Sequence, residues 1–143
     1  MRDIATCIIK YKDSYLFLWR NNDKVMGNMF GNPSGKIEDG ETPLQTAIRE
    51  TKEETGIDVS PEYITCMDVK EGSKRYKKYL FFQEFEKRPD VVLRESEHKG
   101  FVWATIEDAE KLDLIPSVRD SMRFYPRGDK QLVVKDDNTQ KIT

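Results

Sequence analysis

The chain has 143 residues, of which 37% are hydrophobic and 35% charged, and its formal net charge is −2 at pH 7. This length suits one domain with a buried core, so we expect a single domain over residues 1–143. The balance of charge argues against bulk attraction to nucleic acid, an unlikely partner. No apolar run approaches the roughly 20 residues that span a bilayer, and the N-terminus lacks the apolar region of a signal peptide. We therefore expect a cytoplasmic protein with no membrane partner.

The first third of the chain begins with two runs that are typical of strands. Residues 4–10 and 15–20 predict a β-hairpin around the turn Tyr11–Ser14. Residues 21–31 are rich in glycine and asparagine and predict a loop. A short strand and turn near Asn32–Gly35 then lead towards a helix.

That helix is predicted over residues 42–55. Pro43 suits its first turn, Thr42 or Gly40 suits the cap, and Gly56 suits the position after the last turn. Apolar or small residues at helical spacing predict one buried stripe, which consists of Leu44, Ala47, Ile48 and Thr51.

The middle of the chain predicts a second pair of strands, over residues 63–70 and 75–85. Residues 87–97 form a polar, charged loop, and residues 100–104 a short strand. His98, the only histidine, falls between them and is expected to be polar surface, with contact to the substrate or proton transfer as the alternative.

The last part of the chain predicts two helices and a tail. The capping box Thr105–Asp108 opens the first helix, and Pro116 opens a last helix that reaches about Phe124. The tail, residues 126–143, is polar apart from residues 132–134, which allow an edge strand. The order of strands and helices predicts an α/β fold.

Several carboxylates gather in and before the helix over residues 42–55. Glu50, Glu53 and Glu54 lie roughly 180–280° around the helix from the buried stripe, so we expect them to share a separate, exposed face. Mg²⁺ and Mn²⁺ prefer oxygen ligands. An acidic helix face alone is usually only solvated surface. The neighbouring glycines, together with Glu41 and Arg49, favour a metal site instead.

Residues 35–57 resemble the Nudix box, whose pattern is G-x5-E-x7-R-E-U-x-E-E-x-G-U, with U an apolar residue. Ile57 matches the second U, whereas Thr51 stands at the first. Seven fixed matches arise by chance on the order of 10⁻⁸ per start position. The resemblance implies a Nudix-type α/β/α sandwich with a mixed central sheet. The matching residues are Gly35, Glu41, Arg49, Glu50, Glu53, Glu54 and Gly56.

The resemblance also implies a divalent metal cofactor, Mg²⁺ or Mn²⁺. Glu50, Glu53 and Glu54 would hold it, with a backbone carbonyl near Ser34 or Gly35 as a further ligand. The cation would neutralise phosphate oxygens and make a water acidic enough to attack phosphorus.

The general base is left open between Glu53 in the box and Glu97 in the loop. Glu97 is a candidate because the family often has an acidic residue several positions before a strand such as 100–104, and Glu95 is the near rival. Glu41 is expected to orient either Arg49 or a water molecule beside the metal ligands, and Arg49 could hold a carboxylate in place.

Four residues are candidates for substrate binding. Lys36 could meet a phosphate as a point charge, and Arg20 could reach a phosphate or a base. Phe30 and Tyr76 could stack on a nucleobase. The cationic run Lys74–Lys78 is expected to be mainly a solvated hairpin, although it lies where a polyphosphate could reach it.

Together these features predict a metal-dependent hydrolase that cleaves a phosphoanhydride bond in a nucleoside diphosphate linked to another group. The substrate would be a nucleoside triphosphate or a related small nucleotide, and the protein a monomer or homodimer. The alternative is an inactive Nudix-fold module that binds nucleotides or regulates a partner. The complete set of box carboxylates favours the enzyme. The residues of the box recognise the diphosphate and the metal, so they do not identify the particular nucleotide.

Overall fold

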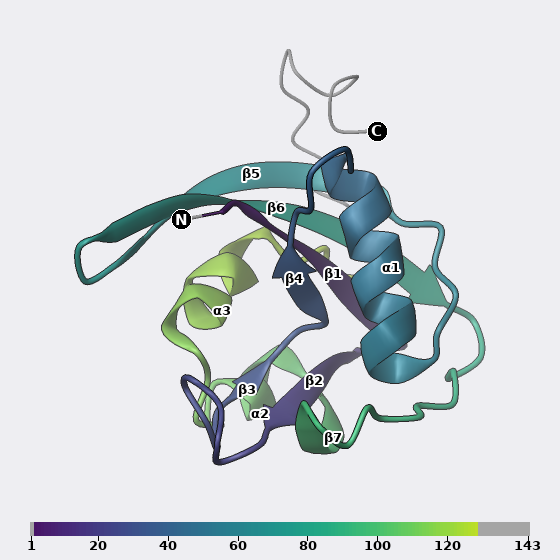
Figure 1. Ribbon diagram of the computed structural model, residues 1–143. Coiled ribbons are helices and arrows are strands. Elements are labelled where there is room, and N and C mark those ends of the chain that lie inside the picture. The colour runs from purple at the N-terminus through teal and green to yellow at the C-terminus, as the bar shows by residue number, and fades with distance from the viewer. Residues whose placement is uncertain (1, 129–143) are drawn as a thin grey trace.

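The computed structural model describes residues 2–128, and these form one mixed sheet with helices packed on it (Figure 1). The strands are β1 (Ile4–Tyr11), β2 (Ser14–Arg20), β3 (Phe30–Gly31), β4 (Ser34–Lys36), β5 (Glu62–Glu71), β6 (Lys74–Phe85) and β7 (His98–Ala104). The helices are α1 (Pro43–Thr55), α2 (Ile106–Ala109) and α3 (Pro116–Ser121), and a 3₁₀ turn, η1 (Met122–Phe124), follows α3.

Strand β1 is the hub of the sheet. It pairs with β6 in parallel and with β2 and β4 in antiparallel orientation. β5 extends the sheet beyond β6, while β3 and β7 both pair with β2. The α/β fold with a mixed sheet expected from the sequence is confirmed.

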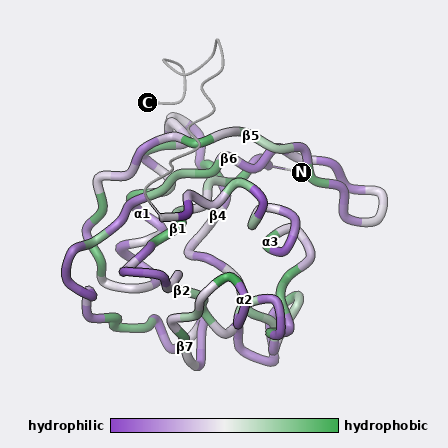
Figure 2. Tube along the Cα trace, turned by 180° about the vertical axis from the view of Figure 1, so that it is seen from behind, coloured by the Kyte–Doolittle hydropathy of each residue, from purple (hydrophilic) through white to green (hydrophobic). Residues whose placement is uncertain are grey.

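Alternation along β1 produces two apolar layers. Ala5 faces α1 and clusters with Ala47, whereas Ile8 belongs to the cluster that contains Val118 and Met122 from α3 and η1. Successive side chains of a strand point to opposite faces, so one strand supplies both cores. Figure 1 accordingly shows α1 and α3 on opposite sides of β1. The far end of the β5–β6 hairpin extends beyond these layers and is largely hydrophilic (Figure 2).

Helix α1 begins and ends as its sequence predicts. Thr42 is the N-cap, and its hydroxyl accepts a hydrogen bond from the Gln45 backbone at 3.1 Å while the Gln45 side chain accepts one from Thr42 N at 2.9 Å. Pro43 occupies the first turn. Gly56 closes the helix in the left-handed conformation, with φ of 74°.

The buried face of α1 differs from the predicted stripe. Ala47 and Thr51 are buried as expected, but Ile48 is 37% exposed. Thr46 and Thr55 are buried in addition, and so is Glu54. The helix is therefore rotated relative to the apolar stripe, because its packing against β1 and β4 brings one carboxylate inside.

Two segment boundaries also need correction. The loop predicted over residues 21–31 ends in strand β3, where Phe30 pairs with Trp19 of β2 and bridges to Leu114. β7 begins at His98, two residues before the predicted start at Gly100. The tail predicted over residues 126–143 falls from residue 129 onwards outside the described residues. No helix within residues 2–128 has the length and apolar character needed to cross a membrane.

The left-handed turn at Gly56 generates a prediction for stability. Gly56→Ala should destabilise the protein by about 1–2 kcal/mol, because a side chain at positive φ crowds the following carbonyl. Gly56→Asn is the matched control and should lose less, since Asn visits this conformation more readily. Urea unfolding of both variants measures the difference, and equal stability of Gly56→Ala and the native protein would refute the prediction.

Candidate active site

The close approach of α1 to β4 organises the site. Any side chain at Gly35 would overlap the Glu50 carboxyl group, so only glycine leaves room for it. One residue earlier, the backbone N–H of Ser34 donates a hydrogen bond to Glu54 Oε1 at 3.2 Å. Two glutamates one turn apart on α1 are thus seated against a strand of three residues.

Arg49 links Glu50 to two further carboxylates, Glu41 and Glu53. Its Nε and Nη2 donate to the two oxygens of Glu41 at 2.7 and 2.9 Å, which makes a bidentate pair. Its Nη1 donates to Glu50 at 2.8 Å and to Glu53 at 3.3 Å. Nη2 also reaches the Lys36 carbonyl at 3.4 Å, which ties α1 to β4 a second time. The expected pairing of Glu41 with Arg49 is therefore present.

These contacts shift two carboxyl groups in opposite directions. Hydrogen bonds from Arg49 lower the pKa of Glu41 to about 2. Burial raises the pKa of Glu54 well above its usual value, and the negative charge of Glu50 raises it further. Glu54 was expected on an exposed face, but it is only 7% exposed. A buried carboxylate beside a second carboxylate is costly to ionise without a neighbouring cation.

The donor chemistry of this region suits a hard divalent cation. Glu50, Glu53 and Glu54 offer carboxylate oxygens, and the space at Gly35 lets one of them lie against the β4 backbone. Within residues 2–128, no three acidic, histidine or cysteine side chains are already gathered in a metal-binding arrangement. Arg49 Nη1 lies between Glu50 and Glu53 and holds both. A metal ion would therefore compete with Arg49 for these oxygens.

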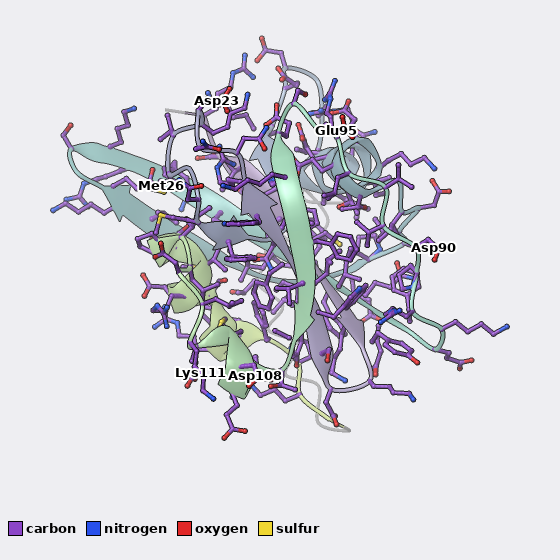
Figure 3. All side chains as sticks on the ribbon, turned by 90° about the horizontal axis from the view of Figure 1, so that it is seen from below. Asp23, Met26, Asp90, Glu95, Asp108 and Lys111 are labelled. Atoms are coloured by element: carbon purple, nitrogen blue, oxygen red, sulfur yellow. The ribbon has the colours of Figure 1, made fainter. Side chains whose placement is uncertain are left out.

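The loop before β7 comes close to the same carboxylates. The charge of Glu97 acts on the buried Glu54, and Arg94 lies 3.7 Å from Glu53 Oε2. Glu97 is also 3.8 Å from Lys24 Nζ. Figure 3 shows Glu95 on the α1 side of β7, and the Glu95 backbone carbonyl accepts a hydrogen bond from the side chain of Asn21 at 2.8 Å.

A cavity of about 380 Å³ lies on the other side of β4, towards α3. Three of the four predicted substrate-binding residues line it, namely Arg20, Lys36 and Tyr76. Phe30 is not part of the lining, because its ring stacks on Trp19 with centroids 5.7 Å apart. The other lining residues are Ile4, Val25, Met26, Gly31, Asn32, Ser34, Glu71, Lys74, Lys78, His98, Ile115, Ser117 and Val118. Ser34 belongs both to this cavity and to the contact with Glu54, so cavity and carboxylates adjoin.

Two polar residues of the cavity are buried, contrary to the sequence prediction. Lys78 is 2% exposed, although the run Lys74–Lys78 was expected to be a solvated hairpin. His98 is 3% exposed, although it was expected at the surface. Burial, followed by the charge of Arg20, lowers the pKa of His98 to about 4, so its ring is neutral at pH 7. The inward position of Lys78 could have been found from the alternation of Tyr76, Lys78 and Leu80 along β6.

The mixed sheet and the carboxylate-bearing helix at β4 define a protein of the Nudix type. The family model for the NUDIX domain matches residues 1–125, and the chain belongs to this family.

Individual relatives agree with this assignment. The 8-oxo-dGTP diphosphatase of Escherichia coli (strain K12) is 39% identical over 66 residues, 46% of this chain and 50% of the relative. The asymmetrical bis(5'-nucleosyl)-tetraphosphatase of Sus scrofa is 33% identical over 90 residues, 56% of this chain and 58% of the relative. The chain thus spans about half of the length of these two proteins. The crystal structure of the MutT protein from Methanosarcina mazei Go1 has a TM-score of 0.76 and 22% identity, and the match covers 85% of this chain and 90% of that one, which shows the shared fold.

The pair of Arg49 and Glu41 generates a prediction for pH dependence. Glu41→Gln should lower the free energy of unfolding by about 1 kcal/mol at pH 7, because both partners are partly exposed. The folded pKa of Glu41 is about 2 and its ordinary value is 4.5. Its stabilisation is therefore complete above pH 4.5 and is lost as the pH falls towards 2.

The gap in stability between the native protein and Glu41→Gln should consequently narrow as the pH falls below 4.5. Urea unfolding at pH 7, 4 and 3 measures this gap. Glu38→Gln is the control, since Glu38 is an exposed carboxylate 3.7 Å from Arg2 Nη1. A gap that stays constant over this pH range would contradict the assigned pairing.

Proposed function

We propose that this protein is a metal-dependent pyrophosphohydrolase that cleaves a phosphoanhydride bond in a nucleoside diphosphate linked to another group. The observation that carries the proposal is the folded arrangement of Glu50, Glu53 and Glu54 beside a cationic cavity. Glu50 and Glu54 contact β4, while the far side of that strand opens into the cavity with Lys36 at its rim. The carboxylates would hold a cation, and the cavity would hold the nucleotide.

We assign metal binding to the carboxylates of α1 and their positioning to Arg49. Glu50, Glu53 and Glu54 would hold Mg²⁺ or Mn²⁺, with the Gly35 carbonyl as a further oxygen donor. The cation, when bound, supplies charge neutralisation at the phosphate oxygens and lowers the pKa of water. Arg49 fixes the directions of Glu50 and Glu53, which preorganises them.

Lys36 and Arg20 at the cavity offer point charges to the phosphates. The leaving group is itself a phosphate, so correct positioning can provide much of the rate. Tyr76 is 7% exposed and lines the cavity, which fits a contact with the nucleoside.

The general base is assigned to Glu97 in preference to Glu53. Glu53 Oε2 already accepts a hydrogen bond from Arg49 at 3.3 Å and lies 3.7 Å from Arg94 Nη1, so two cations already engage this oxygen. Glu97 is 34% exposed and close enough to act on Glu54 electrostatically. A carboxylate that is accessible and near the metal ligands is suited to remove a proton from water.

Two observations bear on the substrate and on the alternative function. The names of the relatives offer 8-oxo-dGTP and bis(5'-nucleosyl)-tetraphosphate as compounds to test first. An inactive nucleotide-binding module would not need two carboxylates drawn towards one strand, one of them against the cost of burial. That arrangement favours the enzyme. A cytoplasmic location and a monomeric or homodimeric state stay predictions from the sequence.

Metal removal is the first test of the proposal. Hydrolysis of a panel of nucleoside triphosphates, dinucleoside polyphosphates and nucleotide sugars should stop in EDTA and return with Mg²⁺ or Mn²⁺. Glu53→Gln should lower the turnover number by at least about 10²-fold, because it removes a negatively charged ligand of the cation that would stabilise the charge on the phosphate in the transition state. Its side chain is 39% exposed, so the fold should persist. Glu107→Gln, on the exposed surface of α2, is the control. Full turnover in excess chelator would refute the proposal.

A pair of loop variants tests the general base. Glu97→Gln should lower the turnover number by roughly 10²-fold, the scale of a lost general base, while Glu95→Gln should change it little. Side-by-side kinetics with saturating metal decide between them. A large loss at Glu95 alone would reverse the assignment, and no loss at either would move the base into the box.

A further inference from the structure

Lys78 brings a buried ammonium group to the cavity. Its Nζ donates a hydrogen bond to Ser117 Oγ at 3.3 Å. Lys10 and Lys77 form ion pairs with carboxylates, whereas Lys78 forms none with the residues that the structure describes. An ammonium group has three N–H donors and no acceptor, so donors remain for a ligand. Burial lowers the pKa of Lys78 to about 8, which leaves the group largely charged at pH 7.

Asn32 adds a second set of donors to the same cavity. It is 5% exposed, and its Oδ1 accepts a hydrogen bond from the Tyr125 hydroxyl at 2.9 Å. Its Nδ2 has no partner among the described residues. The hydrogen bond from Tyr125 occupies the amide oxygen of Asn32, so the N–H groups on Nδ2 are the end of the amide that is left for a ligand. A buried donor without a partner costs free energy, which a bound acceptor would restore.

Part of the wall around these donors is apolar, although Arg20, Glu71 and His98 also line the cavity. Ile4, Ile115 and Val118 line the cavity, and Gly31 leaves space there because a side chain would crowd Ile115. A ligand group with hydrogen-bond acceptors at one edge and an apolar face would match the donors and these apolar side chains. Phosphate oxygens are also acceptors, but a phosphate is polar on all sides. Lys36 and Lys74, which suit a phosphate, also line the cavity, but both are exposed, whereas Lys78 and Asn32 are buried.

A purine with a carbonyl group at C6 meets both requirements. Its O6 and N7 atoms are adjacent acceptors, and Lys and other multiple donors pair with this edge. Adenine has an amino group at the same place, so a donor would face a donor. A site built for one pattern of hydrogen bonds discriminates against the other because buried groups are left unpaired.

We propose that Lys78 and Asn32 bind the O6 and N7 edge of a 6-oxopurine, so that the protein prefers guanine and hypoxanthine nucleotides to adenine nucleotides. This inference rests on the proposed function, because the base belongs to the nucleotide that is hydrolysed. Lys78 is then a specificity-determining residue, which contacts the base and takes no part in the cleavage.

Binding of nucleoside monophosphates tests the preference without requiring catalysis. Calorimetry with GMP, IMP and AMP should show GMP and IMP binding about 10-fold or more tighter than AMP. IMP lacks the 2-amino group of GMP, so similar affinities for both assign the preference to the O6 edge. Lys78→Met should weaken GMP and IMP to the level of AMP and leave AMP within about twofold. Lys77→Met is the matched control, because Lys77 is the exposed neighbour on β6 and should keep the preference.

Two results would overturn the inference. One is equal binding of GMP and AMP by the native protein, and the other is an equal loss for all three nucleotides in Lys78→Met, which would assign Lys78 to phosphate. If Lys78→Met does not fold, Asn32→Asp replaces the donor by an acceptor and should shift the preference towards AMP, and an unchanged preference would refute the proposal. Measuring the turnover of GTP and ATP with Mg²⁺ tests the proposed hydrolase function separately from the proposed base preference. No turnover of any nucleotide refutes the proposed function, whereas equal turnover of both with intact activity refutes only the base preference.

Discussion

The contact between α1 and β4 is the constraint on which the site depends. Gly35 has no side chain, so Glu50 can lie against the strand, and Ser34 N–H holds Glu54 beside it. The short strand is in turn fixed by its pairing with β1 at the centre of the sheet. The capping residues of α1 set where the helix starts and stops, which determines that Glu50 and Glu54 reach β4 at all. The position of the carboxylates is thus a consequence of backbone packing.

This arrangement carries an electrostatic cost, which a bound cation would relieve. Glu54 is buried next to Glu50, which raises its pKa, and Arg49 compensates the more exposed carboxylates through bonds to Glu41, Glu50 and Glu53. Glu41 anchors the guanidinium group from outside the helix, so a metal ion can compete for the carboxylates while Arg49 keeps one bidentate partner. The glutamate before the helix therefore contributes by positioning, consistent with its distance in sequence from the other three.

The sequence predicted the elements better than it predicted which polar side chains are buried. The helix α1 was found from Pro43 and Gly56, and the long strands from their alternation, because these signals are local. The burial of Glu54, Lys78 and His98 was missed, since charged and polar residues are expected outside unless a partner is known. Those partners lie far away in the chain: Ser34 for Glu54, and Ser117 for Lys78. Only the folded sheet brings them together.

The distance in sequence between contacting residues also explains why the box motif does not identify the substrate. Its residues follow one another along a turn and a helix, so a single local pattern records them. The cavity, in contrast, collects residues from β1, β2, β6, β7 and α3, which are far apart in the sequence, so no single local pattern records them. Strand β4 lies between the carboxylates of α1 and the cavity, because Gly35 faces α1 while Ser34 and Lys36 line the cavity. Under the proposed roles, the chemistry would stay fixed in the helix while changes at positions such as Lys78 and Asn32 would alter the choice of base.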